Sequence, residues 1–242
     1  MCIRDSLYVI PDALEEGTYI YYNFADMLNL VALESCLNKC VVVGESIGNV
    51  PDGFLDAISA KNIHSLSILW AERWDCGWGD FRQPGQYPKD AFASVATHDI
   101  APLKMWWFGY DIELSYSLGL IGSVEDRTSA YHKREADRGK LLAALDQAKV
   151  WPEDKQRSGD YIYGEKYPEG IEEAVMRFMS RSASPVFLAQ LEDILHVEKM
   201  QNLPGTDRDK HPNWRRKIPV DLEDLADDIA YIRCVQAIKK ER

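Results

Sequence analysis

Four short apolar runs along the chain predict buried strands. They are rich in β-branched and aromatic residues, as strands are, and they lie at residues 41–43, 65–70, 93–96 and 185–191. Between them, apolar residues recur at helical spacing over longer segments. A repeated order of strand and helix is typical of parallel βαβ units. The pattern therefore predicts an α/β protein.

Helices are expected between and after these runs, and two of them have a recognisable start. Asn23 is a suitable cap for a helix whose apolar positions recur from Met27 onwards. Ser123 and Asp126 approximate a capping box at the start of a long helix whose many charges indicate a solvated face. The expected helices span or begin at residues 23–37, 51–60, 102, 123–150, 168 and 219–242.

Composition narrows the choice of partners. The chain has 242 residues, 46% of them hydrophobic, and a formal net charge of -11. So acidic a balance argues against nucleic acid or an anionic membrane as the partner. The 7 Trp and 12 Tyr residues suit stacking on sugar rings, although such side chains more often lie in cores. We expect no segment that spans a bilayer and no signal peptide.

The five cysteines include no C-x-x-C pair. Their odd number and their spacing favour free thiols in a reducing, cytoplasmic setting. No set of His, Cys and Asp residues has the spacing of metal ligands, so neither a metal nor another cofactor is expected.

Two carboxylates follow predicted strands. Glu45 comes after the run at 41–43, and Asp99 comes after the run at 93–96. In a parallel α/β barrel, catalytic residues lie at the C-terminal ends of the strands. The competing interpretation of Glu45 is a solvated loop carboxylate. A long Gly- and Trp-rich loop at 71–88 is a further candidate, because loops of this length are usually functional.

Three stretches of sequence resemble a known family. Residues 41–51 read VVVGESIGNVP, residues 94–107 read SVATHDIAPLKMWW, and residues 201–206 and 212–217 read QNLPGT and PNWRRK. Together they resemble the amylomaltase family of 4-α-glucanotransferases, also called disproportionating enzymes. The family patterns are GED-LG-TVP, THD-LPTL-GWW, and NLPGT followed by NWRRK. The resemblance extends from about Leu7 to the C-terminus.

The resemblance implies a fold. Residues 7–242 are expected to form the C-terminal half, about strands five to eight, of a (β/α)8 TIM barrel with inserted helices. Residues 1–6 match nothing in the family and are expected to be a non-native leader. Residues 7–11 and 17–22 are expected to form a loop that follows an upstream strand. Half a barrel is expected to leave strand edges and part of its interior exposed.

The resemblance also implies a chemistry, the retaining transfer of α-1,4-glucan segments between maltodextrins by double displacement. Glu45 matches the general acid/base, and Asp99 matches the third carboxylate, which holds hydroxyls of the donor sugar. His98 matches a donor-site histidine, Asp75 roughly matches a carboxylate that contacts sugar, and Asn202 lies in the loop that would line the cleft. The competing interpretations are a capped strand-end histidine for His98 and a surface-turn aspartate for Asp75.

The chain departs from the family in two places. Ser46 stands where the family has an aspartate, which removes a negative charge beside Glu45. The nucleophilic aspartate of the family belongs to an Arg-Ile-Asp-His-type motif, which is expected upstream of residue 1. Asp5 is not assigned this role, because it lies nearer to Glu45 than the family's nucleophile lies to its acid/base. The parent enzyme is expected to be active, and this chain is expected to have little or no activity.

Two alternatives remain open. One is a hydrolytic enzyme of the α-amylase type, in which water replaces the sugar acceptor. The other is a non-catalytic remnant that binds glucan. In every case the expected partner is a maltodextrin or another α-1,4-glucan, with no nucleic acid and no membrane.

Overall fold

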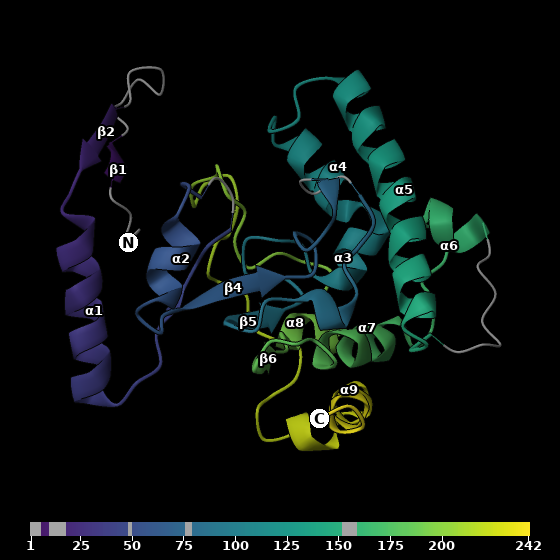
Figure 1. Cartoon of the computed structure of the whole chain (residues 1–242). Helices are drawn as coiled ribbons and strands as arrows, with labels where there is room; N and C mark the ends of the chain where they lie inside the picture. Colours follow the sequence, from purple (N-terminus) through teal and green to yellow (C-terminus); the bar gives the residue numbers. More distant parts are fainter. Residues whose placement is uncertain (1–5, 10–17, 48–49, 76–78, 152–158) are drawn as a thin grey trace. The chain divides into compact units, whose positions relative to one another are not determined.

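The structure is a computed structural model, and it describes residues 6–9, 18–47, 50–75, 79–151 and 159–242 (Figure 1). Backbone hydrogen bonds order its strands as β1-β2 in one sheet and β3-β4-β5-β6 in another. The contacts divide the chain into two compact units, Met1–Leu66 with Asp90–Phe92 and Ser67–Lys89 with Ala93–Arg242. Each unit has its own hydrophobic cluster.

The first unit begins with a hairpin that the sequence interpretation missed. β1 (Ser6–Val9) pairs antiparallel with β2 (Thr18–Tyr21), so that Ser6 lies opposite Tyr21. The expectation of a loop over 7–11 and 17–22 is therefore wrong for these strand residues. The reason is local, because both segments are rich in the β-branched and aromatic residues that favour strands.

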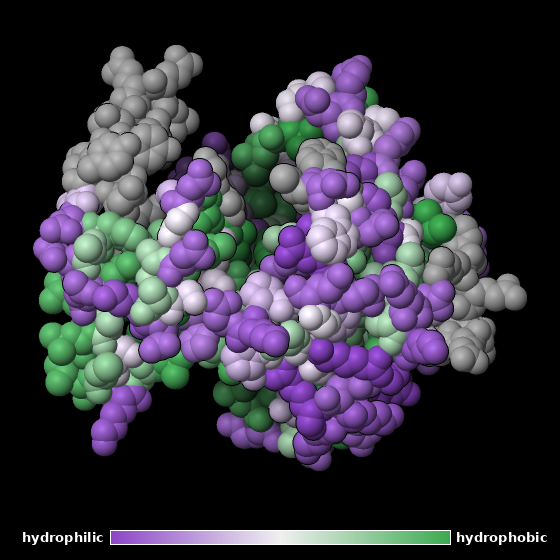
Figure 2. Space-filling model, viewed as in Figure 1, coloured by the Kyte–Doolittle hydropathy of each residue, from purple (hydrophilic) through white to green (hydrophobic). Residues whose placement is uncertain are grey.

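Helix α1 (Phe24–Asn38) follows the hairpin and starts where expected. The side chain of Asn23 accepts a hydrogen bond from the backbone N–H of Asp26 at 3.4 Å, which confirms the predicted cap. The first unit also contains α2 (Phe54–Ser59), within the expected 51–60. Leucines on α1 remain exposed, and Figure 2 shows hydrophobic residues on the surface of this helix; they are Leu30, Leu33 and Leu37.

The strand predicted at 41–43 is shorter than expected and only partly buried. β3 (Val43–Gly44) pairs in parallel with β4 (His64–Ile68). Val41 and Val43 are exposed, so the prediction of a fully buried strand is wrong. Successive strand side chains point to opposite faces. Of the three valines at 41–43, Val42 alone is among the residues that pack on the small cluster of Leu28, Ile58 and Ile63.

The sheet order also includes β5 and β6. β5 (Ala91–Ser94) leads into Val95 and Ala96, which are buried as predicted. Between β4 and β5, the described residues form a 3-10 turn, η3 (Pro84–Gln86), and contain no α-helix, in agreement with the loop predicted at 71–88. The general order of strand and helix is interrupted there. β6 (Val186–Leu188) is also less buried than expected, because Leu188 is exposed.

Most of the described helices lie in the second unit. The buried residues of α7 (Ile171–Ser180) include the four that define the predicted apolar face, namely Ile171, Val175, Phe178 and Met179. The leucine stripe predicted on α5 is buried as well; it consists of Leu141, Leu142 and Leu145. The other helices are α3 (Leu103–Phe108), α4 (Tyr110–Ser117), α5 (Val124–Gln147), α6 (Gly159–Tyr163), α8 (Leu191–Ile194), η4 (Leu225–Asp227) and α9 (Ile229–Lys239).

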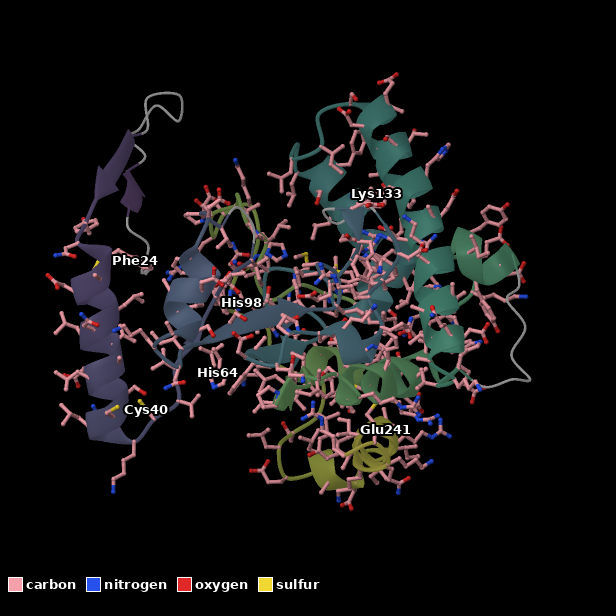
Figure 3. The ribbon with its side chains drawn as sticks, in the orientation of Figure 1. Phe24, Cys40, His64, His98, Lys133 and Glu241 are labelled. Carbon is pink, nitrogen blue, oxygen red and sulfur yellow. The ribbon has the colours of Figure 1, made fainter. Side chains whose placement is uncertain are left out.

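The last helix begins about ten residues later than predicted. The side chain of Asp228 accepts from the backbone N–H of Tyr231 at 2.9 Å and so caps α9 at that point. Beyond α9, Glu241 (Figure 3) forms ion pairs with Arg177 of α7 at 2.7 Å and with Arg181, the C-cap residue of α7, at 2.6 Å. These pairs connect the C-terminal end of the chain to the core helix.

Two arginines of α5 are buried, although the sequence suggested that the charges of this helix are solvated. Arg134 forms a bidentate ion pair with Asp111 at 2.9 and 2.7 Å. Arg138 donates to the backbone carbonyls of Trp107 at 2.7 Å and Ile162 at 2.9 Å. A guanidinium carries several donors in a fixed geometry, so it can satisfy carbonyls from separate elements at once. That is why these two charges lie inside.

A buried carboxylate holds the start of α3. Asp193 of α8 accepts from the backbone N–H of Leu103 at 2.7 Å. Its second oxygen has no hydrogen-bond partner among the described residues. Burial raises the pKa of Asp193 to about 7, and the nearby carboxylates of Glu192 and Glu172 act in the same direction.

The substitution Arg138→Ala should strongly destabilise the protein. It removes the donors to the buried carbonyl of Trp107 and the half-buried carbonyl of Ile162, and a buried acceptor left without a donor costs about 1–3 kcal/mol. Urea unfolding followed by circular dichroism would measure the loss. His132→Ala, on the exposed face of the same helix, is the control and should change the unfolding midpoint little. Equal midpoints for the two variants would contradict the inferred role of Arg138.

The substitution Asp193→Asn should change how stability depends on pH. The pKa of Asp193 is higher in the folded protein than its ordinary 3.8, so the folded state holds a proton that the unfolded state releases. The binding of this proton contributes to the free energy of unfolding, and the contribution is fully present below about pH 4. It is lost as the pH rises to about 7. The total loss is up to roughly 4 kcal/mol, at about 1.4 kcal/mol per pKa unit.

Urea midpoints measured from pH 4 to pH 8 would test this pH dependence. The difference in stability between wild type and Asp193→Asn should change across the range, whereas the exposed control Asp80→Asn should follow wild type. A constant difference for Asp193→Asn would show that Asp193 titrates normally in the folded chain.

Candidate functional site

Glu45 lies where the sequence predicts a catalytic carboxylate. It follows β3 directly and its side chain is exposed. The next residue, Ser46, both accepts from the backbone N–H of Leu66 and donates to its carbonyl, each at 3.2 Å. This hydroxyl continues the link between the two strands beyond the last paired residues, Gly44 and Ser65. The carboxylate therefore projects from a strand end that is held on its partner strand.

Three of the predicted site residues meet at the C-terminal end of β5. The Asn202 amide donates to Oδ1 of Asp99 at 2.5 Å. Nε2 of His98 (Figure 3) lies 3.4 Å from the same oxygen. The side chains of His98 and Asp99 keep 49% and 37% of their surface exposed, so a ligand can reach both. This group contains one anionic, one amide and one imidazole side chain, which are suited to hydrogen-bonding sugar hydroxyls.

A tight turn presents Asp99 and His98. The backbone N–H of Asp99 donates to the Thr97 hydroxyl at 3.3 Å, and the N–H of Ile100 donates to the Thr97 carbonyl at 3.1 Å. Upstream of the turn, Ser94 donates to the Ala96 carbonyl at 2.9 Å. Short hydroxyl-to-backbone bonds of this kind stabilise turns, so the chain leaves the core and turns sharply at the candidate site.

Trp214 is a site residue that the sequence interpretation missed. Its ring centroid lies 4.8 Å from that of His98, with 53° between the ring planes, and 63% of its surface is exposed. The only sequence signal was its position in the PNWRRK segment, which we used for the resemblance alone. An exposed tryptophan beside exposed polar groups offers an apolar face to a ligand.

Asp75 is not joined to this group by any contact that the structure describes. It is exposed and has a left-handed backbone with φ of 51°. It follows Trp74, whose ring is approached by the Arg82 guanidinium at 5.0 Å. The structure therefore adds no support for a sugar-contacting Asp75, and that assignment stays a prediction.

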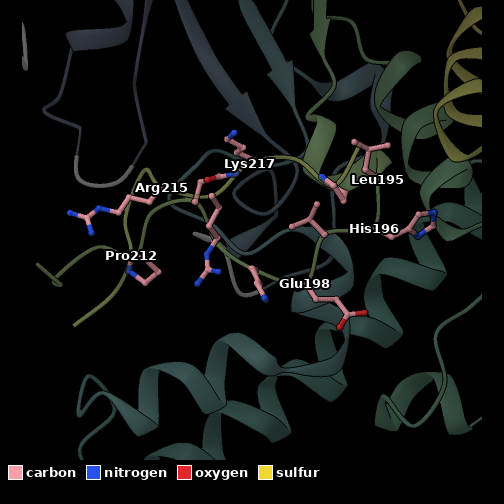
Figure 4. Close-up of a pocket in the computed structure, with 11 residues that line it drawn as sticks. Leu195, His196, Glu198, Pro212, Arg215 and Lys217 are labelled. Carbon is pink, nitrogen blue, oxygen red and sulfur yellow. The ribbon is translucent and has the colours of Figure 1, made fainter. Parts of the chain in front are cut away.

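A pocket of about 620 Å³ borders the loop that carries Asn202 (Figure 4). Pro212 and Arg215 lie on one side of it, and His196 and Glu198 lie on the other. Its lining includes four cationic side chains, those of Lys199, Arg215, Arg216 and Lys217. Such cations are best matched by carboxylates or phosphates. A neutral glucan suits the group around Asp99 better than this pocket.

Among the described residues, no group of three or more His, Cys, Asp or Glu side chains could hold a metal ion. No helix in this part of the chain is long and apolar enough to cross a membrane.

Solved structures share this fold. The chain superposes on the amylomaltase from Corynebacterium glutamicum with a TM-score of 0.84 and 26% identity, covering 96% of this chain and 34% of that one. Amylomaltase from Streptococcus agalactiae, solved with acarbose, gives a TM-score of 0.60 at 14% identity, which concerns the fold alone. With the parallel β3-β4 pair, the match shows an α/β chain that forms part of a TIM barrel.

Sequence comparisons agree with the structural ones. The 4-alpha-glucanotransferase of Haemophilus influenzae is 29% identical over 224 residues, which are 93% of this chain and 30% of that protein. The Mycobacterium tuberculosis 4-alpha-glucanotransferase is 31% identical over 246 aligned positions, covering 96% of this chain and 32% of that protein. The chain thus spans about a third of the length of these relatives. The model of glycoside hydrolase family 77, described as 4-alpha-glucanotransferase, matches residues 5–223, and the chain belongs to this family.

Proposed function

We propose that this chain supplies the acid/base and the donor-sugar contacts of an enzyme that transfers α-1,4-glucan segments between maltodextrins. The observation that carries the proposal is the group of Asp99, His98, Asn202 and Trp214, which is exposed at the end of β5. The family match includes all four residues and Glu45.

The proposed reaction is a retaining double displacement. Glu45 donates its proton to the glycosidic oxygen while the bond from that oxygen to the anomeric carbon breaks, and a nucleophilic carboxylate bonds to the carbon. Glu45, now ionised, then takes the proton of an acceptor hydroxyl. The oxygen of that hydroxyl bonds to the anomeric carbon and displaces the nucleophilic carboxylate. We assign the nucleophile to none of the described carboxylates.

Asp99 and its neighbours are proposed to hold the donor sugar. The Asn202 amide occupies one Asp99 oxygen at 2.5 Å, so the carboxylate has a fixed direction in which to accept bonds from sugar hydroxyls. His98 lies beside Asp99 and can bond a further hydroxyl. Such bonds contribute to catalysis where they strengthen as the sugar ring distorts towards the oxocarbenium-like transition state.

Trp214 is proposed to stack on a glucosyl ring. Its exposure and its position against His98 support this role, because a sugar bound to His98 would lie next to the indole. Aromatic faces bind the apolar faces of rings without a charge partner. This suits a neutral polymer in a chain whose net charge is -11.

The expected setting is cytoplasmic. The three cysteines that the structure describes, Cys36, Cys40 and Cys234, are free, which supports a reducing compartment. Maltodextrins are the proposed partners there, and neither nucleic acid nor membrane is proposed.

Removal of the site side chains should weaken glucan binding. Titration of the chain with acarbose or maltoheptaose in a calorimeter would measure Kd for wild type, Asp99→Asn and Trp214→Ala. We expect Asp99→Asn to raise Kd about tenfold or more, because hydrogen bonds to charged groups contribute about 1.5–3 kcal/mol. Trp214→Ala should raise Kd about three- to tenfold, since a ring contact contributes about 0.5–1.5 kcal/mol.

Tyr163→Ala is the matched control for Trp214→Ala. Tyr163 has the same exposed fraction as Trp214, 63%, but lies on α6. Its removal should leave Kd unchanged. Binding that is equal in wild type and in both site variants would exclude the group around Asp99 as the sugar site.

Product analysis separates the three functional interpretations. After incubation with maltotriose, a ladder of longer maltodextrins supports transfer, and release of reducing ends alone supports an amylase-type hydrolase. Glucan binding without any product supports the non-catalytic alternative. Where products form, Glu45→Gln should abolish them, because an amide cannot donate the proton that the leaving oxygen needs. Full turnover by Glu45→Gln would refute the acid/base assignment.

A further inference from the structure

A buried amide lies at the centre of the loop that carries Asn202 and Trp214. Asn213 is buried, and its Oδ1 accepts from the backbone N–H of Leu203 at 2.9 Å and lies 2.6 Å from Nδ1 of His211. Its Nδ2 donates to the carbonyl of Thr206 at 3.2 Å and to the hydroxyl of Thr206 at 3.1 Å. The amide oxygen and the amide nitrogen of Asn213 are thus both bonded to other residues of the same loop.

The residues bonded in this way are next in sequence to the two candidate sugar contacts, Asn202 and Trp214. Leu203 follows Asn202 directly, and Trp214 follows Asn213. The backbone N–H of Trp214 donates to the carbonyl of Gln201 at 2.9 Å. The two sides of the loop are therefore connected on each side of Asn202, once through a side chain and once through the backbone.

Two details show that the loop conformation is held by these bonds. Trp214 has a left-handed backbone with φ of 61°, which costs a residue with a side chain about 1–2 kcal/mol and persists only where surrounding contacts impose it. The Thr206 hydroxyl, which accepts from Asn213, donates in turn to the Leu203 carbonyl at 2.6 Å. Nε2 of His211 has no partner among the described residues, but both polar atoms of the Asn213 amide and the Thr206 hydroxyl are bonded. Bonds shared in this way between one buried amide and its loop favour a single conformation.

We propose that Asn213 is a positioning residue for the glucan site, which places the Asn202 amide on Asp99 and the Trp214 ring against His98. The inference rests on the proposed function for its effect on glucan binding. Its structural part does not, since the placement of the two side chains can be observed without a ligand. Asn213 itself is buried and contacts no sugar in this proposal.

The test compares three substitutions in the full chain. Asn213→Ala removes all of the side-chain bonds. Asn213→Asp keeps the acceptor for Leu203 and loses the donor to Thr206. Thr206→Val removes only the hydroxyl and is the mildest change, so it reports on the loop even where Asn213→Ala fails to fold. Thr128→Val is the matched control, because the Thr128 hydroxyl also bonds a backbone carbonyl, at 2.8 Å, but on the exposed face of α5.

Two readouts are expected to change together. Kd for acarbose should rise about tenfold in Asn213→Ala and less in Thr206→Val, with a thermal midpoint close to that of wild type for Thr206→Val. By NMR, the Asn202 side-chain amide and the backbone N–H groups of Leu203 and Trp214 should exchange with solvent at least about tenfold faster. Thr128→Val should match wild type in both measurements.

A double-mutant cycle distinguishes positioning from general stability. The effect of Asn213→Ala on Kd should largely disappear in a chain that already carries Asn202→Ala and Trp214→Ala, because Asn213 acts through those two residues. An undiminished effect would overturn the proposal, and so would slow exchange of the Asn202 amide in Asn213→Ala. Where wild type binds no glucan, the proposed function fails, and the exchange measurements alone decide whether Asn213 positions the loop.

Discussion

The candidate site depends on the hydrogen bond between the Asn202 amide and the Asp99 carboxylate. It is 2.5 Å long and joins two loops whose contacting residues are 103 positions apart in the sequence. Without it, an exposed aspartate on a turn would sample several rotamers, and fixing one of them on binding would cost conformational entropy. With it, the carboxylate has a preferred direction before any ligand arrives. The rest of the second unit can be understood by how it holds these two loops.

The loop of Asp99 is held through helix α3, which follows it immediately. Asp193 accepts from the N–H of Leu103 at the start of α3, and Arg138 donates to the carbonyl of Trp107 near its end. Helix termini leave backbone groups without partners inside the helix, and a buried helix needs partners for them from elsewhere. Here two buried polar side chains, Asp193 and Arg138, satisfy opposite ends of the same short helix. Side chains that do not reach the site thus support the helix that follows the Asp99 turn.

The sequence pattern predicted helices and strands correctly where the local sequence preference agrees with the packing of the folded chain. The apolar face of α7 and the cap of α5 at Ser123 needed only local information. Arg138 could not be predicted as buried, because its burial depends on carbonyls from two other helices. The exposure of Val43 and Leu188 was missed for a related reason, since an apolar strand is buried only where another element covers each face. Likewise, the resemblance suggested His98, Asp99 and Asn202, but Trp214 emerged only from its contact with His98.

The departure at Ser46 has a structural consequence that bears on Glu45. A serine hydroxyl donates and accepts, and here it does both with the backbone of Leu66. An ionised aspartate at this position could accept from the N–H of Leu66 but could not donate to its carbonyl. With serine in place of aspartate, the negative charge beside Glu45 is absent. The side chain instead makes a second hydrogen bond to Leu66, which an ionised aspartate could not make. Since that bond fixes the strand end from which Glu45 projects, the departure removes an electrostatic influence on the acid/base while strengthening its support.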